Sequence, residues 1–140
     1  VQFEALPEEF RHAKQVWFIG CGTSAHAGMI GTLLLEDLAR IPAHTEIASE
    51  ARYRIIPEGT LIVAISQSGT TTDTNRTVDL ARSRGAVVLA IVNRRGSDLV
   101  DKSDGVLYTS DGRDVEMSVA STKAFTCQLA VLAALAAPAR

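Results

Sequence analysis

The sequence has little cysteine, no long apolar run and no excess of basic charge, and each shortage excludes a class of protein. Its two cysteines, Cys21 and Cys127, belong to neither a Cys-x-x-Cys motif nor a Cys/His cluster. This argues against a disulfide framework, predicts no metal site and favours a reducing, cytoplasmic location. The longest apolar stretch, 129–137, has nine residues, whereas a membrane-spanning helix needs about 20. We therefore expect no membrane partner.

Charged residues are balanced and scattered along the chain. The 14 Lys and Arg against 16 Asp and Glu give a formal net charge of -2, so nothing favours nucleic acid as a partner. Apolar residues make up 46% of the 140 residues, which is the balance of an ordinary globular domain, and this length predicts a single domain, 1–140. Because the chain begins at Val1 without an initiator Met, we expect it to be excised from a longer protein.

Short apolar runs alternate with longer helical patterns, which predicts an α/β domain. The runs at 61–65 and 87–92 are continuously apolar, as in parallel strands that helices cover on both faces. Right-handed crossovers then favour a three-layer, doubly wound sheet. The expected strands are Val16–Ile19, Thr45–Ala48, Leu61–Ile65, Val87–Val92 and Val106–Tyr108, and the expected helices are Pro7–Ala13, one from the first turn to Arg40, Thr72–Arg84 and Ser121–Leu135.

The loop after the third expected strand has the composition of an anion site. Six of its nine residues, 66–74, carry hydroxyls, and Gly69 lets the backbone approach a ligand closely. The helix that follows would add unpaired N–H groups and a partial positive charge. A single helix cap would explain one hydroxyl but not six. We therefore predict a phosphate site, whose donors are Ser66, Ser68, Thr71 and the amide of Gln67.

The first turn, 20–25, allows two interpretations. It fits the permissive Gly-x-Gly-x-x-Ala dinucleotide pattern, and Glu46 follows about twenty residues later, which alone would suggest NAD. A dinucleotide fold, however, needs no second phosphate loop after the third strand. In the alternative, the glycines make a tight turn and Thr23 and Ser24 direct their hydroxyls toward a sugar-like ligand. We favour the second interpretation and predict no cofactor.

A third polar turn, 118–123, opens the last expected helix. Ser121 could simply cap that helix, and this interpretation stays open. In a doubly wound sheet, however, the turn lies at the same edge as the other two loops. Three Ser/Thr-rich turns at one edge describe a pocket for a small, hydroxyl-rich, singly phosphorylated ligand. No histidine and carboxylate are fixed near Cys21 by spacing, so we assign no catalytic residue.

At four blocks the chain resembles a sugar isomerase (SIS) domain, most closely the first of the two such domains in the glutamine–fructose-6-phosphate amidotransferases. The resemblance extends over nearly the whole chain. Its blocks are 21–24, 47–54, 66–74 and 119–125. One position departs from the family pattern, because Thr70 stands where the family usually has Glu.

The resemblance implies a flavodoxin-like, five-stranded parallel sheet with a hexose-phosphate site. By family role, Ser66, Gln67, Ser68 and Thr71 would hold the phosphate, and Thr23, Val119 and Ser121 would contact the sugar. The catalytic Glu, His and Lys of the family belong to a second SIS domain and the tail. This chain would therefore bind fructose 6-phosphate or glucosamine 6-phosphate without converting it. Its expected partners are that second domain, a glutaminase domain and a second copy in a homodimer.

Two other functions remain compatible with this resemblance. SIS domains also serve as sugar-phosphate sensors in transcription regulators, which normally carry a preceding helix-turn-helix module. The first 15 residues contain no basic run and nothing helix-turn-helix-like. The third possibility is a stand-alone phosphosugar isomerase whose sites are completed across an oligomer.

Overall fold

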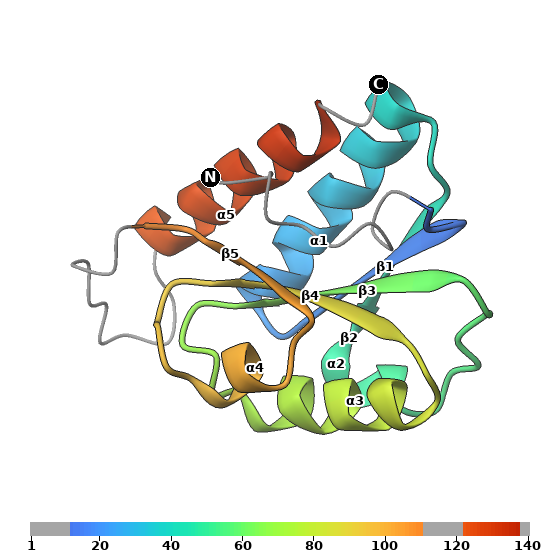
Figure 1. Ribbon diagram of the computed structural model, residues 1–140. Helices are drawn as coiled ribbons and strands as arrows, with labels where there is room; N and C mark the ends of the chain where they lie inside the picture. Colours follow the sequence, from blue (N-terminus) through green and yellow to red (C-terminus); the bar gives the residue numbers. More distant parts are fainter. Residues whose placement is uncertain (1–11, 111–121, 138–140) are drawn as a thin grey trace.

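The computed structural model describes residues 12–110 and 122–137, and in them five parallel strands form one sheet with helices on both faces (Figure 1). The strand order is β2-β1-β3-β4-β5. This order is flavodoxin-like, and it confirms the predicted three-layer, doubly wound α/β class. The strands are β1 (Gln15–Gly20), β2 (Ala43–Ile47), β3 (Thr60–Ser66), β4 (Val87–Val92) and β5 (Gly105–Tyr108).

The two strands that the sequence marks most clearly lie at the centre of the molecule. Every residue of β3 is buried, as is every residue of β4 after Val87. Alternate residues serve opposite faces: Val63 and Ile65 belong to one core, whereas Ile62 and Ala64 belong to the other. Burial of such a side chain stabilises the fold by roughly 1.5–3 kcal/mol. This two-sided burial explains why the runs are continuously apolar instead of alternating.

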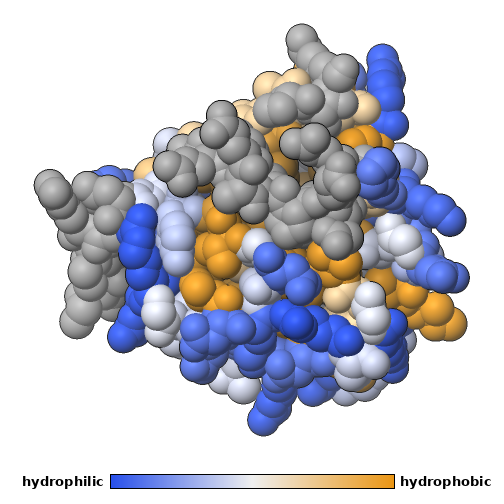
Figure 2. Space-filling model, in the orientation of Figure 1, coloured by the Kyte–Doolittle hydropathy of each residue, from blue (hydrophilic) through white to orange (hydrophobic). Residues whose placement is uncertain are grey.

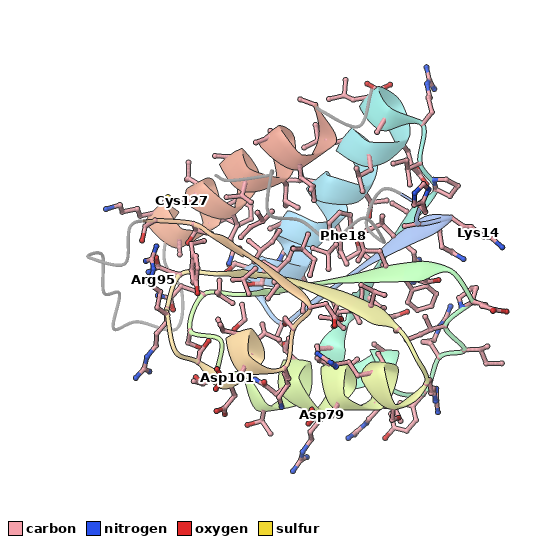
Figure 3. All side chains as sticks on the ribbon, in the orientation of Figure 1. Lys14, Phe18, Asp79, Arg95, Asp101 and Cys127 are labelled. Carbon is pink, nitrogen blue, oxygen red and sulfur yellow. The ribbon has the colours of Figure 1, made fainter. Side chains whose placement is uncertain are left out.

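The helices divide between the two faces of the sheet (Figure 1). One face carries α1 (Thr23–Leu34), its π-helical continuation η3 (Leu35–Ala39) and α5 (Thr122–Ala136). Figure 3 shows Phe18 of β1 in this layer, where its side chain is fully buried. The other face carries α3, together with two short helices. They are α2 (Ala48–Ala51), α3 (Thr72–Ser83) and α4 (Asp98–Asp101).

The second strand lies earlier than predicted, at Ala43–Ile47 instead of Thr45–Ala48. The parallel ladder with β1 starts where Val16 N–H donates to Pro42 O at 2.9 Å, and Ala48 already opens α2. The residues Ala43 and His44 carry no β-branched signal, so the pattern alone placed the strand too late. The short helices α2 and α4 were not predicted, because four residues cannot display a helical period.

The helix after the first turn reaches Leu34 as an α-helix and continues to Ala39 with wider, π-helical turns. It ends at Arg40, which adopts a left-handed φ of 56° just ahead of Pro42. The predicted leading helix, Pro7–Ala13, lies mostly outside the described residues. Of its two described residues, His12 belongs to a turn and Ala13 is not helical.

The surface seen in Figure 2 is mostly polar on the side of α3 and α4, where hydrophilic side chains gather. Lys102 and Asp79 form an ion pair there at 3.0 Å. Within residues 12–110 and 122–137, no helix is both long enough and apolar enough to cross a membrane.

Candidate functional site

Two polar loops meet at the carboxyl ends of the central strands. The chain leaves β1 toward α1 on one face and leaves β3 toward α3 on the other, so the loops diverge between these two neighbouring strands. Such a divergence is where doubly wound sheets bind their ligands. A contact connects the two segments, because Cys21 Sγ lies 3.9 Å from Thr74 Oγ1. The structure therefore brings together the first turn and the hydroxyl-rich loop, as the sequence predicts.

The hydroxyl of Ser66 organises the start of the loop after β3. Ser66 is only 2% exposed, and its Oγ accepts a hydrogen bond from Gly69 N–H at 3.0 Å. The same oxygen lies 3.1 Å from Thr71 Oγ1. One buried hydroxyl thus closes the turn and connects its two ends. This fixes the partly exposed Thr71 hydroxyl at the rim of the loop.

Ser68 and Thr70 form a second unit at the outer side of the loop. Both the backbone N–H and the Oγ–H of Thr70 donate to Ser68 Oγ, at 3.2 and 3.0 Å. A hydroxyl oxygen accepts two hydrogen bonds and donates one. With both acceptor positions used, the Ser68 hydroxyl retains only its donor, which suits an anionic ligand. Thr70, the residue that departs from the family pattern, therefore has a defined place in the loop.

The loop after β4 and the start of α4 support this segment from the side. Gln67 O accepts from Asn93 N–H at 3.1 Å and from Arg94 N–H at 3.3 Å, and Gly69 O accepts from Leu99 N–H at 3.1 Å. Carbonyl oxygens repel anions, and these hydrogen bonds hold the carbonyls of Gln67 and Gly69 toward the donors. The backbone conformation also depends on Gly69, whose φ is +69°.

The amino end of α3 adds its own donors. The helix begins at Thr72, and Thr71 makes no side-chain capping hydrogen bond. The first N–H groups of a helix have no acceptor within the helix and carry a partial positive charge. The structure thus gives no support to a simple capping role for the Thr71 hydroxyl. A loop of hydroxyls placed against a free helix end can bind a phosphate without lysine or arginine.

In the first turn, the two predicted hydroxyls have different surroundings. Thr23 is exposed at the start of α1, whereas Ser24 is buried, and its Oγ accepts a hydrogen bond from Gln128 Nε2 of α5 at 3.1 Å. Glu46, which the NAD interpretation needs for a ribose hydroxyl, is already paired with His44 and Arg54 at 3.2 and 3.5 Å. These pairs reduce the support for that alternative. The other two predicted sugar contacts, Val119 and Ser121, lie outside the described residues.

A hollow of about 850 Å³ opens at the opposite edge of the sheet. It is lined by the amino-terminal parts of β3 and β4 and by Arg84 and Gly85, which follow α3. The carboxyl end of a helix carries a partial negative charge, which disfavours a phosphate. Figure 3 shows the two edges, with Arg95 near the carboxyl end of β4 and Lys14 near the start of β1. The two described loops, 20–25 and 66–74, lie on the Arg95 side.

The sequence pattern did not predict three buried polar residues that lie beneath the β3 loop. Asn75, Asn93 and Ser97 are all buried and all belong to this part of the molecule. Asn75 could have been predicted, because its polar amide stands on the face of the α3 helical pattern that packs against the sheet. Asn93 and Ser97 could not have been predicted, since their contacts depend on how the β4 loop folds beside the β3 loop.

The fold and this loop define a class, a doubly wound α/β domain with a hydroxyl-rich loop after its third strand. The comparisons identify the family within that class. The model of the SIS domain matches residues 9–138, and the chain therefore belongs to the SIS domain family. This confirms the resemblance found in the sequence.

The similar proteins are much longer than this chain. It is 49% identical over 130 residues to glutamine–fructose-6-phosphate aminotransferase (isomerizing) of Symbiobacterium thermophilum, covering 91% of this chain and 21% of that protein. With the Streptomyces coelicolor enzyme of the same name it is 50% identical over 125 residues, covering 88% of this chain and 20% of that protein. The chain thus spans about a fifth of these relatives.

Among solved structures, the fold is similar to the C-terminal domain of glucosamine-fructose-6-phosphate aminotransferase from Francisella tularensis. The TM-score is 0.90 with 39% sequence identity, covering 99% of this chain and 40% of that chain.

Proposed function

We propose that this chain binds a hexose phosphate, fructose 6-phosphate or glucosamine 6-phosphate, as the substrate-binding half of the isomerase part of a glucosamine-6-phosphate synthase-like enzyme. The observation that supports this most is the loop after β3, where hydroxyls and backbone donors surround the amino end of α3. The similarity to enzymes named for fructose 6-phosphate supports the choice of a phosphosugar.

Each loop residue has a separate part in the proposal. The hydroxyls of Ser68 and Thr71 and the amide of Gln67 donate to the phosphate oxygens. Ser66 is buried and acts through Thr71, whose hydroxyl it meets at 3.1 Å. Thr23, Ser24, Val119 and Ser121 are proposed to contact the sugar hydroxyls, and Thr23 is the exposed one of the described pair.

The chain is proposed to work as one part of a larger, cytoplasmic protein, beside a second SIS domain and a glutaminase domain and in a homodimer. The relatives are about five times as long as this chain, which supports further domains. On α1, Met29 and Leu33 are 48% and 67% exposed, and such apolar side chains favour contact with another domain or subunit. In this proposal the proton transfer of the isomerase step belongs to other segments, so the chain by itself binds without converting its ligand.

A titration tests the proposed binding directly. The chain would be titrated with fructose 6-phosphate, glucosamine 6-phosphate, unphosphorylated fructose and NAD, and followed by thermal unfolding and by NMR. Ligand at 100 times its dissociation constant stabilises a fold by about 2.7 kcal/mol. We expect stabilisation by the phosphorylated sugars alone, with NMR shifts at residues 66–71. A response to NAD alone, or isomerase activity of the chain by itself, would contradict the proposal.

A further inference from the structure

We propose that Asn75 is a positioning residue that holds the backbone of the phosphate loop in its binding form. Its side chain amide lies beneath the loop, on the first turns of α3, and the residue is 8% exposed. Asn75 Nδ2 donates to Gly69 O at 3.2 Å and to Thr71 O at 3.0 Å. One buried amide thus connects two alternate carbonyl groups of the loop. The inference rests on the proposed function and adds a residue to that site.

The orientation of these two carbonyl groups matters for an anion. If either oxygen turned outward, it would face the phosphate with a partial negative charge and oppose binding. Gly69 O is held by two donors, Asn75 Nδ2 and Leu99 N–H, and Thr71 O also accepts from Asn75 N–H at 3.0 Å. Among the residues that the structure describes, Asn75 is the one whose side chain donates to both carbonyls. Its removal would leave each carbonyl with a single backbone donor, Leu99 N–H for Gly69 O and Asn75 N–H for Thr71 O, while the rest of α3 keeps its helical hydrogen bonds.

A contribution to the stability of the folded state does not explain why an amide stands at position 75. Asn75 Oδ1 is buried and has no hydrogen-bond partner among the described residues. A buried polar atom without a partner destabilises the folded state, so an apolar side chain would serve the core better. The opposite assignment of the amide would place Oδ1 against two carbonyl oxygens, and mutual repulsion excludes it. The contribution of the Asn75 amide is therefore its two hydrogen bonds to the loop carbonyls of Gly69 and Thr71.

The chain contains a matched control on the same helix. Thr77 is 1% exposed, and its Oγ1 donates to Ala48 O at 2.6 Å, a buried side-chain hydrogen bond to a backbone carbonyl outside the loop. Thr77→Val removes that bond and nearly preserves the shape. Asn75→Leu similarly removes both hydrogen bonds of the amide and puts an apolar side chain of the same branched shape in its place. Both variants lose buried hydrogen bonds, but only Asn75→Leu acts on the loop.

The experiment compares the wild-type chain, Asn75→Leu and Thr77→Val in two measurements. Urea unfolding reports stability, and calorimetric titration reports the dissociation constants of glucosamine 6-phosphate and unphosphorylated glucosamine. We expect Asn75→Leu to bind glucosamine 6-phosphate at least about tenfold more weakly, which corresponds to about 1.4 kcal/mol. Any binding of glucosamine should stay unchanged, and Thr77→Val should bind both within twofold of wild type.

Each outcome decides one of the two proposals. If the wild-type chain binds glucosamine 6-phosphate and Asn75→Leu binds it equally well, the role of Asn75 is wrong while the proposed function stands. Equal weakening by Thr77→Val would also overturn that role, because it would show a general effect of stability. If the wild-type chain binds no phosphosugar, the proposed function fails and the role of Asn75 fails with it. Should Asn75→Leu not fold, Asn75→Asp keeps the volume and sets a carboxylate against both carbonyls, so the same or greater weakening is expected.

Discussion

The turn after β1 and the loop after β3 are similar in sequence, since both combine glycine with Ser and Thr, but they are built differently. In the β3 loop the hydroxyls bond within the loop, and the carbonyl of Gly69 is held by Leu99 and Asn75. In the β1 turn, no atom of residues 12–110 or 122–137, other than those of Gly22 and its two chain neighbours, lies within 4 Å of where a Cβ of Gly22 would stand. The β3 loop is thus braced at Gly69 by neighbouring segments, whereas the β1 turn is open at Gly22 among the described residues. Glycine and hydroxyl content alone does not distinguish the two.

Replacing the two glycines should separate these segments most strongly. In Gly69→Ala the new Cβ would lie 2.1 Å from Ser97 Oγ and 2.6 Å from Ser97 Cβ, at a φ of +69°. We expect a loss of about 3 kcal/mol or more in the free energy of unfolding, from strain and overpacking combined. In Gly22→Ala, at a φ of +58°, only the backbone strain applies, at about 1–2 kcal/mol. Urea unfolding measures both, and equal losses would mean that the β3 loop is not braced.

Removing one buried hydroxyl from each segment should give a smaller effect. Ser66→Ala deprives Gly69 N–H and Thr71 Oγ1 of their partner, so we expect a loss of about 2 kcal/mol in stability and a weaker hold on phosphorylated sugars. Ser24→Ala leaves Gln128 Nε2 without its acceptor. It should cost about 1 kcal/mol and affect phosphorylated and unphosphorylated sugars alike. The two variants would be compared by urea unfolding and calorimetry, and a phosphate-specific loss in Ser24→Ala would reverse the assignment.

Thr70→Val should change binding and leave stability nearly unaltered. The variant removes the Oγ–H that donates to Ser68 Oγ, while the backbone N–H of Thr70 still donates. Because Thr70 is exposed, the free energy of unfolding should change little. Because Ser68 Oγ loses one of the two donors that orient it, we expect about threefold weaker binding of a sugar phosphate. Thr70→Ser, which keeps the hydroxyl, is the control in the same titration. An unchanged dissociation constant in Thr70→Val would show that Ser68 needs no orientation by its neighbour.

The smallest effect is expected at the connection between the β1 turn and α5. Gln128→Leu removes the donor to Ser24, but it also removes Gln128 Oε1, a buried oxygen without a partner among the described residues. The two changes oppose each other, so we expect the stability to change by less than about 1 kcal/mol. A loss well above this in urea unfolding would mean that the β1 turn depends on α5 as strongly as the β3 loop depends on α3.

The fold was predictable where a signal is local. The bounds of β4 were predicted without error, and β3 was predicted to within one residue at each end, because continuous apolar runs mark buried parallel strands. The start of α3 at Thr72 was also predicted correctly. The shift of β2 and the helices α2 and α4 were missed, because their limits depend on pairing and on the packing of neighbours.

For the candidate site, the sequence indicated which residues carry hydroxyls but not how they are held. Its loop residues from Ser66 to Thr71 do lie together at the carboxyl edge beside the first turn. The supports from Asn93 and Leu99 come from the loop after β4 and from α4, and no spacing in the sequence reveals them. The hydroxyl of Ser24 illustrates the reverse problem, since a promising polar side chain is engaged inside the fold. Whether any of these residues binds a sugar phosphate stays a prediction.

The position of β1 within the sheet has a consequence for how the chain is made. β1 is bordered by β2 on one side and by β3 on the other, and Gln15 is aligned with Thr60. During synthesis, the second edge of β1 therefore waits for a strand that is made roughly 45 residues later, which takes about 2–9 seconds at cellular rates of translation. For that time the apolar strand has an unpaired edge outside the ribosome. During this interval the nascent chain is open to aggregation and to capture by chaperones.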